Sequence, residues 1–345
     1  MPQWDFLDFL VRQARQFPTF DLRMRHEAAG VMVDGHRITG VEVRVPDGST
    51  QRIRAGLVVA CDGRHSTLRQ AAQMEVQESG VPIDVLWFHI SRQPGDPERA
   101  LGNFNYGKAL ILIHRGDYYQ AGLIIRKGSF DELQSRGIGR FREAVSQVAP
   151  YLAGRVSELR DWDQIKLLSV QINRLRQWFR PGLLCIGDAA HAMSPAWGVG
   201  INLAIQDATA AARVLAAPLR ENQVTEDLLA AVQRRRDLPT QVTQFLQMNV
   251  HRAMDRFLFR HSGPLKAPWQ LRVAVAVPGL QHLTGRFVGF GVRPEEIRPS
   301  TGARKLPAWA VCAATAIAAA VTTVRILKHT RRKSTTAAAP PGWRL

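Results

Sequence analysis

The sequence predicts an α/β fold that contains a sizeable β-sheet region between its two main motifs. Two short, continuously apolar runs, residues 57–61 and 183–186, are typical of fully buried strands, and each leads into a polar turn that contains glycine. Much of the chain between them is β-rich. A length of 345 residues is enough for two domains, or for one domain with a large insertion.

The first sixty residues are expected to form a helix followed by a meander of strands. Residues 4–17 carry apolar side chains at helical spacing and stop before Pro18. Asp34-Gly35 and Asp47-Gly48 are strong hairpin signals. The β-rich runs around these turns are residues 20–27, 30–33, 37–45 and 51–59.

The middle of the chain is expected to contain a second set of strands and a helix. Ser129 and Glu132 have the spacing of a capping box, and helical spacing continues from there to Val148. The β-rich runs on either side of this helix are residues 84–90, 109–114, 118–125 and 164–172.

Two further helices are expected after the buried run at 183–186. An Ala-rich helix should end near Leu215. The next helix should begin at Thr225, with acidic residues in its first turn, and reach about Phe259 with an interruption at Pro239.

The chain is strongly basic: 46 Lys and Arg residues against 29 Asp and Glu residues give a net charge of +17. Such a charge suits an anionic cofactor, a membrane surface or nucleic acid, and the number alone does not choose among them. Because no recognised nucleic-acid-binding motif is found, we expect no nucleic-acid partner. Three cysteines without paired spacing and the lack of a secretory leader indicate a reducing, cytoplasmic location.

An uncharged run lies near the end of the chain, at residues 307–324, and a basic cluster follows it. Eighteen residues in a helix span about 27 Å, close to the roughly 30 Å of a bilayer core. Most of the run is Ala and Thr, which contribute little to insertion. A membrane anchor and a soluble or peripheral helix are both consistent with this composition.

The first chemical motif runs from Asp62 to Arg69, directly after the buried run at 57–61. The carboxyl end of a strand in an open α/β sheet is a common position for ligand binding. Asp62 could accept from sugar hydroxyls or an ordered water, and Arg64 or Arg69 could approach a phosphate. The alternative is a plain Asp-Gly turn with solvated arginines.

The second motif follows the run at 183–186 and is longer. Gly187 has no side chain, so a ligand can approach the backbone there, and Asp188 supplies an acceptor at that point. Gly198 and Gly200 expose backbone N–H groups at the start of a helix, whose positive end favours an anion or an electron-rich ring. The alternative is an ordinary strand–turn–helix with glycine for packing.

Together these motifs resemble two fingerprints of the FAD-dependent aromatic hydroxylases, the p-hydroxybenzoate hydroxylase-like flavoprotein monooxygenases. The matching positions are Asp62-Gly63, Ser66 and Arg69, then Gly187-Asp188, Pro195 to Asn202 and Asp207-Ala208. The order of the motifs and their separation also match, and the resemblance covers about residues 1–298. It implies an α/β fold of the FAD/NAD(P)-binding, glutathione-reductase-like type, with an antiparallel substrate sheet inserted and helices at the C-terminal end.

The resemblance also implies roles for individual residues. Asp188 would hydrogen-bond the ribityl chain of FAD, and Asp62 and Arg69 would lie near the pyrophosphate. The helix after Gly198 would point its N-terminus at the pyrimidine edge of the flavin and stabilise the reduced form. The other expected cofactor-binding residues are Gly63, Gly187, Pro195, Val199, Gly200, Ile201 and Asn202.

The reaction implied by the resemblance is a hydroxylation. NAD(P)H would reduce FAD, O₂ would be captured as a flavin hydroperoxide, and one oxygen would pass to an aromatic or other apolar small molecule. Because the flavin carries the chemistry, no catalytic triad or metal cluster is expected, and no catalytic residue is assigned. A non-catalytic or inactive remnant of the flavoprotein fold, with a binding role, is the alternative.

The Gly-x-Gly-x-x-Gly turn with which the family begins is not found in the sequence. We therefore expect the fold to lack its first βαβ unit and Met1 to correspond to an internal position of the family's layout. The expected divisions are a partial FAD-binding domain at 1–75, a β-sheet substrate domain at 76–175, the Gly-Asp motif with C-terminal helices at 176–298, and a basic tail at 299–345.

Several residues near the motifs have two interpretations. His191 is either a base or a structural residue, and Trp197 either stacks on the flavin or covers the turn. Cys61 and Cys185 end apolar runs and are expected to be buried and inert. A set of aromatic residues could line a substrate pocket or pack on a sheet: Trp87, Phe88, His89, Tyr118 and Tyr119. The lack of a Trp-x-Trp-x-x-Pro segment disfavours a halogenase.

Overall fold

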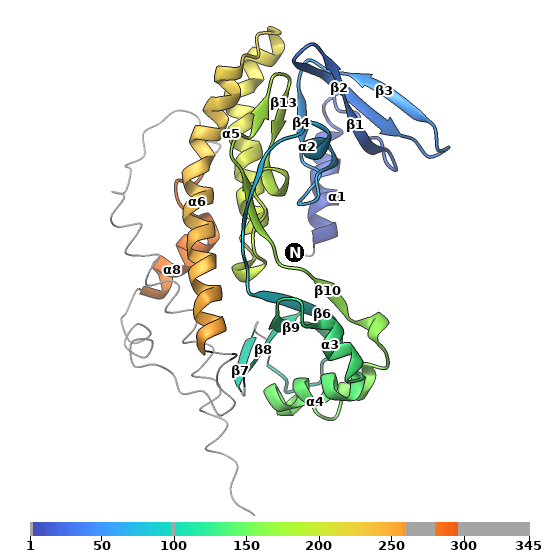
Figure 1. The fold of residues 1–345 in the computed structure, drawn as a ribbon, viewed down its shortest axis with the longest axis vertical. Coiled ribbons are helices and arrows are strands. Elements are labelled where there is room, and N and C mark those ends of the chain that lie inside the picture. Colours follow the sequence, from blue (N-terminus) through green and yellow to red (C-terminus); the bar gives the residue numbers. More distant parts are fainter. Residues whose placement is uncertain (1–2, 98–100, 106, 258, 260–279, 296–345) are drawn as a thin grey trace, which may run out of the picture.

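The computed structural model describes residues 3–97, 101–105, 107–257, 259 and 280–295. The molecule has two parts stacked along its long axis, and one long helix runs beside both (Figure 1). That helix, α6 (Glu226–Phe257), packs against α5 (Gly200–Arg220) in the upper part. Both motifs lie in the upper part, and the larger sheet lies in the lower part.

The upper part begins with α1 (Gln3–Ala14), which is followed by an antiparallel meander. Asp34-Gly35 closes the first hairpin, with Gly35 at a φ of 58°, and Asp47-Gly48 separates the second pair of strands. Both hairpin predictions are therefore confirmed. The three strands are β1 (Glu27–Asp34), β2 (Arg37–Arg44) and β3 (Thr50–Arg54).

A small central sheet carries both motifs. β4 (Val58–Ala60) pairs in parallel with β13 (Leu183–Cys185), and β13 pairs antiparallel with β12 (Phe179–Arg180). Because β4 and β13 are parallel, the segments that follow them emerge at the same edge of the sheet. One segment leads to α2 (Thr67–Ala71) and the other leads to α5.

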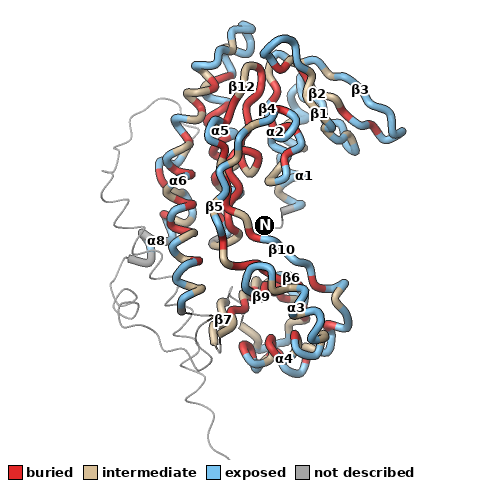
Figure 2. Tube along the Cα trace, viewed as in Figure 1, coloured by how far each residue is buried: buried red, intermediate tan, exposed pale blue. Residues whose placement is uncertain are grey.

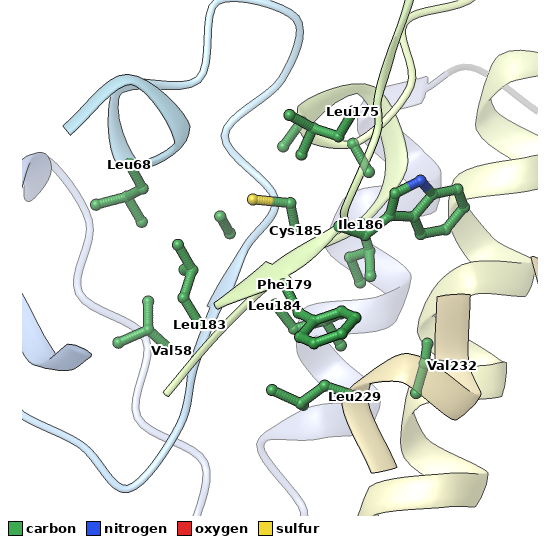
Figure 3. Close-up of a cluster of buried hydrophobic side chains, with 14 of the residues drawn as sticks. Val58, Leu68, Leu175, Phe179, Leu183, Leu184, Cys185, Ile186, Leu229 and Val232 are labelled. Carbon is green, nitrogen blue, oxygen red and sulfur yellow. The ribbon is translucent and has the colours of Figure 1, made fainter. Parts of the chain in front are cut away.

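Buried side chains hold this sheet against the helices (Figure 3). Leu183 and Leu184 on β13 are fully buried, and α6 contributes Leu229 and Val232 to the same cluster. Burial of each leucine stabilises the fold by roughly 1.5–3 kcal/mol. Figure 2 shows the contrast along the chain: the central strands are mostly buried, whereas α1 and the meander are largely exposed.

The lower part is a five-stranded antiparallel sheet in the order β10-β6-β9-β8-β7. One face packs against α3 (Phe130–Ser135) and α4 (Ile138–Val148), where the rings of Phe88 and Phe141 meet edge to face at 5.2 Å. The opposite face packs against side chains of α6, including Met248. The strands are β6 (Ile83–Ser91), β7 (Leu101–Asn105), β8 (Lys108–His114), β9 (Tyr118–Arg126) and β10 (Lys166–Leu168).

A two-stranded antiparallel ribbon connects the two parts. It consists of β5 (Val76–Ser79) and β11 (Ile172–Leu175), which lie along the centre of the molecule in Figure 1. Beside α6 lies α8 (Leu280–Phe290), whose Phe287 packs against Leu246.

The predicted run at 51–59 forms two strands, β3 and β4, and β4 is not fully buried, because Val59 is 41% exposed. Four further local predictions differ from the structure. Residues 20–26 form no strand, and β1 begins at Glu27. The Ser129 hydroxyl makes no cap bond and donates instead to the Arg126 carbonyl. The single helix predicted after Ser129 is divided at Gly137, which has a φ of 83°. The predicted strand at 164–172 contains β10 and the first residue of β11, because the chain leaves the larger sheet after β10 and enters the connecting ribbon. The fourth difference is at Pro239, where α6 continues without a break.

Among the described residues, no helix combines the length and apolar character needed to span a bilayer. The predicted tail at 299–345, including the uncharged run at 307–324, lies outside the described residues.

Candidate functional site

The structure brings the two motifs into direct contact although more than one hundred residues separate them. Arg64 Nη2 lies 3.3 Å from Asp188 Oδ2, and each of these side chains is about one quarter exposed. Arg69 Nη1 donates to the Ala189 carbonyl at 3.0 Å. An ion pair and a buried hydrogen bond therefore connect the turn after β4 to the turn after β13.

In the first motif, two side chains cap α2. Ser66 Oγ accepts from the Arg69 N–H at 3.0 Å, and Asp62 Oδ2 accepts from the Leu68 N–H at 3.1 Å. Both bonds satisfy N–H groups that a helix of this kind leaves unpaired at its start. Gly63 has a φ of 83° and open space around it, which is the geometry of a tight turn.

Arg69 is 5% exposed, and its guanidinium also donates to the Arg64 carbonyl at 2.7 Å. Its hydrogen bonds thus go to the backbone of both motifs. In this structure Arg69 holds the two turns together, and its predicted position beside a pyrophosphate stays a prediction.

In the second motif, Asp188 lies in the turn at 187–189 and is close in space to the start of α5. A Cβ placed on Gly200 would be 4.0 Å from Asp188 Oδ1, so the carboxylate is close to the first turn of the helix. The residue before the helix, Val199, is buried and provides no side-chain cap. Gly198 has a φ of 63°, and a Cβ at this position would meet no atom within 4 Å. The carboxylate and the uncapped helix start therefore lie next to each other.

Gly187 serves close packing. It has a φ of 58°, and a Cβ there would be 3.0 Å from the Ala204 Cβ on α5. Its N–H donates to Asp207 Oδ2 at 3.0 Å. The structure thus favours the packing interpretation of this glycine, because the helix occupies the space that a side chain would need.

Asp207 is fully buried and accepts hydrogen bonds from two further side chains. His191 Nε2 lies 2.5 Å from its Oδ2, and Arg236 Nε on α6 lies 2.9 Å from its Oδ1. Burial alone would raise the pKa of Asp207, but the facing His191 and Arg236 hold that pKa below its usual value. The His191 ring also packs on Trp178 at 4.7 Å. His191 is 1% exposed, which favours its structural interpretation.

The remaining predicted cofactor residues lie at the same end of α5. Asn202 Nδ2 donates to the Gly289 carbonyl of α8 at 3.2 Å, and Ile201 is 45% exposed. Pro195 is half-buried at the start of the short turn before α5. The Trp197 side chain lies outside what the structure describes.

The two cysteines within the described residues differ in environment. Cys185 is fully buried, as expected, but Cys61 is exposed, so the expectation of a buried thiol was wrong there. Cys61 lies beyond the last residue of the short strand β4, where the chain turns outward.

The five aromatic residues lie on different surfaces of the lower sheet. Phe88 and Tyr119 are buried on the face that packs against α4. Trp87 is half-buried on the opposite face, and the His89 and Tyr118 rings lie 4.8 Å apart at a tilt of 52°. Side chains alternate along β6 and β9, so Trp87, His89 and Tyr118 all lie on the face opposite α4.

The donor set at the α5 start fits the FAD suggested by the motifs. Asp188 can accept from hydroxyl groups, and the uncapped helix start presents N–H donors to an electron-rich edge. Arg64 Nη1 is buried and has no hydrogen-bond partner. A buried guanidinium nitrogen without a partner is uncommon, and a polar ligand beside Asp188 would satisfy it.

Sequence reasoning did not find the pairing of Arg64 with Asp188, the role of Asp207 or the polar residues of α6. For Asp207 a signal was present: it shares a helical face with Leu203 and Ala211, so an acid falls on the buried stripe of α5. For Arg64 no local signal indicates the partner, because that partner lies 124 residues away.

Comparison with known proteins agrees with these features. The family model "FAD binding domain" matches residues 1–246. The chain is 32% identical over 267 residues to 6-methylpretetramide 4-monooxygenase of Streptomyces rimosus, covering 74% of this chain and 61% of that protein. The chain thus spans less than two thirds of the length of this relative.

Solved structures share the fold. PqsL of Pseudomonas aeruginosa, a probable FAD-dependent monooxygenase, has a TM-score of 0.61 at 24% identity, over 75% of this chain and 72% of that one. OxyS anhydrotetracycline hydroxylase from Streptomyces rimosus has a TM-score of 0.63 at 18% identity, over 87% of this chain and 59% of that one. The mixed α/β fold with antiparallel sheets is shared with these enzymes. The chain belongs to the family of FAD-dependent aromatic hydroxylases and related flavoprotein monooxygenases.

Proposed function

We propose that this chain binds FAD and acts in an NAD(P)H-dependent monooxygenase that hydroxylates an aromatic or other apolar small molecule. The observation that carries the proposal is the position of Asp188, whose carboxylate lies beside Gly200 at the uncapped start of α5. Family membership supports FAD as the cofactor, and the names of two relatives, a monooxygenase and a hydroxylase, support the reaction class.

The residues at this position would have distinct tasks. Asp188 would accept hydrogen bonds from the ribityl hydroxyls, and Arg64, now paired with Asp188, would exchange that contact for one with the cofactor. The Gly198 N–H donates to the Pro195 carbonyl at 3.1 Å, so the amides of Val199 and Gly200 are the ones that would face the electron-rich edge of the flavin ring. There the helix dipole favours negative charge by about 0.3–2 kcal/mol. When bound, FAD accepts a hydride and activates O₂.

The face of the lower sheet near α6 supports an apolar substrate. Trp87 lies over Gly122 of the neighbouring strand, since a Cβ on Gly122 would be 3.1 Å from the ring. Val85 and Met248 belong to the same apolar cluster. A half-buried tryptophan held flat by a glycine offers an aromatic surface on which a planar substrate could stack.

The proposal is tested in two steps. First, the purified chain is titrated into FAD while flavin fluorescence and the visible spectrum are recorded; we expect quenching and a shifted flavin spectrum. Second, oxidation of NADH and of NADPH is followed with a panel of phenols and larger aromatic compounds; at least one should stimulate it. A folded sample that changes neither flavin signal would contradict the proposal and favour a non-catalytic remnant of the fold.

A further inference from the structure

The long helix α6 buries a row of polar side chains on one face. Arg236, Thr240, Gln244, Gln247 and His251 recur every three or four residues, and none is more than 5% exposed. A buried helix face is normally apolar, because a polar group removed from water costs free energy unless it finds a partner. The groups to which these side chains hydrogen-bond therefore indicate the structural role of the row.

Three of these side chains bind one short segment, residues 192–196, which connects the Gly-Asp turn to α5. Gln247 makes three of the bonds: its Nε2 donates to the Ser194 carbonyl at 3.0 Å and to the Ala196 carbonyl at 3.1 Å, and its Oε1 accepts from the Ser194 N–H at 3.1 Å. Gln247 thus bonds to both donors and acceptors of this peptide, as a neighbouring strand would.

The neighbouring side chains extend the same contact. Gln244 Nε2 donates to the Ala192 carbonyl at 3.1 Å and to the Asn173 carbonyl at 2.7 Å. His251 Nε2 lies 2.7 Å from Ser194 Oγ. Side chains of α6 therefore bond both backbone polar groups of Ser194 and the carbonyls of Ala192 and Ala196.

This arrangement fixes the position of the α5 start. Asp188 lies on the N-terminal side of the bound segment and Gly200 lies on its C-terminal side, so the segment determines how the carboxylate faces the helix start. We infer that Gln247 is a positioning residue, which holds residues 194–200 in register with Asp188 through α6. Its effect on FAD rests on the proposed function, but its effect on the segment does not.

The test compares Gln247→Met with Gln241→Met. Methionine has nearly the volume of glutamine but leaves the Ser194 N–H and two carbonyls without partners. Gln241 is an exposed residue of the same helix, and its side chain bonds only to Asp237 among the described contacts. Gln247→Asn keeps the amide but is shorter by one methylene, so it cannot make all three bonds and we expect an intermediate effect.

Two readouts are used on each variant. Hydrogen exchange in the cofactor-free protein should be at least tenfold faster in the peptide 193–200 for Gln247→Met, with exchange in β9 unchanged. FAD affinity should fall at least tenfold, and the visible spectrum of the bound flavin should change. Gln241→Met should leave both readouts at the wild-type values.

Unchanged exchange in the peptide 193–200 would overturn the inference, and so would an increase of equal size in β9, which would indicate general destabilisation. If Gln247→Met does not fold, the same comparison is made with Gln247→Asn. If the wild-type chain itself binds no FAD, the proposed function fails, but the exchange data still decide whether Gln247 positions the segment.

Discussion

Asp188 faces Arg64 on one side and the start of α5 on the other. A carboxylate at this point can accept from two hydroxyl groups or ion-pair with an arginine, and an amide can do neither equally well. The ion pair is partly solvated, so its own contribution to stability is small, about 1 kcal/mol or less. We therefore expect substitutions here to affect ligand binding much more than folding.

The first prediction concerns Asp188→Asn. The affinity for FAD should fall at least tenfold, because the ribityl hydroxyls lose a charged acceptor, while the free energy of unfolding should change by less than about 1 kcal/mol. Flavin fluorescence titration and chemical denaturation measure the two effects. Asp117→Asn, at an exposed turn of the lower sheet, is the control and should change neither. Equal FAD affinity in wild type and Asp188→Asn would contradict the assignment.

The second prediction concerns His251, which is 1% exposed. Burial lowers its pKa from 6.5 to about 4. The unfolded chain therefore takes up a proton at this histidine at a higher pH than the folded chain does. Stability is full above about pH 6.5 and is lost as the pH falls toward 4, by roughly 2–3 kcal/mol for this group.

Denaturant unfolding of wild type and His251→Gln at pH 7 and pH 4.5 measures this difference. The wild type should lose about 2–3 kcal/mol more than the variant between these pH values. His36→Gln, at an exposed turn, should follow the wild type. Parallel pH profiles for wild type and His251→Gln would show that the histidine titrates normally in the folded state.

At the scale of elements, the contact between the Gly187 turn and α5 depends on small side chains. Gly187 and Gly35 share a φ of 58°. A Cβ added at Gly187 would contact Ala204, whereas a Cβ added at Gly35 would meet no atom within 4 Å. The two positions thus separate the cost of the backbone conformation from the cost of the contact.

The third prediction uses this pair. Gly35→Ala should destabilise the fold by about 1–2 kcal/mol, the cost of a left-handed conformation for alanine. Gly187→Ala should cost about 1–3 kcal/mol more, because α5 must also move. Chemical denaturation gives both values. Adding Ala204→Gly to Gly187→Ala removes the clashing methyl group, so the double variant should regain part of the extra stability that Gly187→Ala loses. The regain is reduced by about 1 kcal/mol, the cost of a glycine within a helix. Equal losses of unfolding free energy in Gly35→Ala and Gly187→Ala would show that α5 moves without cost, which would contradict the prediction.

Local sequence signals predicted the elements whose determinants are local. The hairpins at Asp34-Gly35 and Asp47-Gly48 and the buried strand β13 required only neighbouring residues to specify them. The predicted interruption at Pro239 was wrong. Proline removes one helical N–H, but tertiary contacts on both sides outweigh this loss, because Arg236 and Gln244 are buried against other elements. Ser129 was misjudged because its hydroxyl has a nearer acceptor at Arg126.

At the scale of the whole molecule, α6 joins the two parts. Its first half packs with the central sheet through Leu229 and Val232, and its second half packs with the lower sheet through Met248 and Met254. Most of the row of buried polar residues, from Arg236 to Gln247, lies between these two contacts. The geometry of the site therefore depends on both parts of the molecule through one helix.

The composition of the site could be predicted in part. The motifs pointed to Asp188 and the Gly198–Gly200 turn, and the structure brings these together. The Arg64–Asp188 ion pair and the bonds of Gln247 could not be foreseen, because each joins residues more than fifty positions apart. Such pairs are set by the docking of elements, which no local pattern encodes.

The measurement that tests the central claim most directly is a hydrogen-exchange footprint of FAD on this chain. At an FAD concentration equal to the wild-type Kd, slower exchange is predicted in two separate peptides, one containing residues 187–189 and the other containing residues 198–203. At the same FAD concentration both effects should be largely lost in Asp188→Asn, because its affinity is lower. Protection confined to other regions, or protection that persists in Asp188→Asn, would contradict the claim that the carboxylate and the start of α5 together hold the flavin.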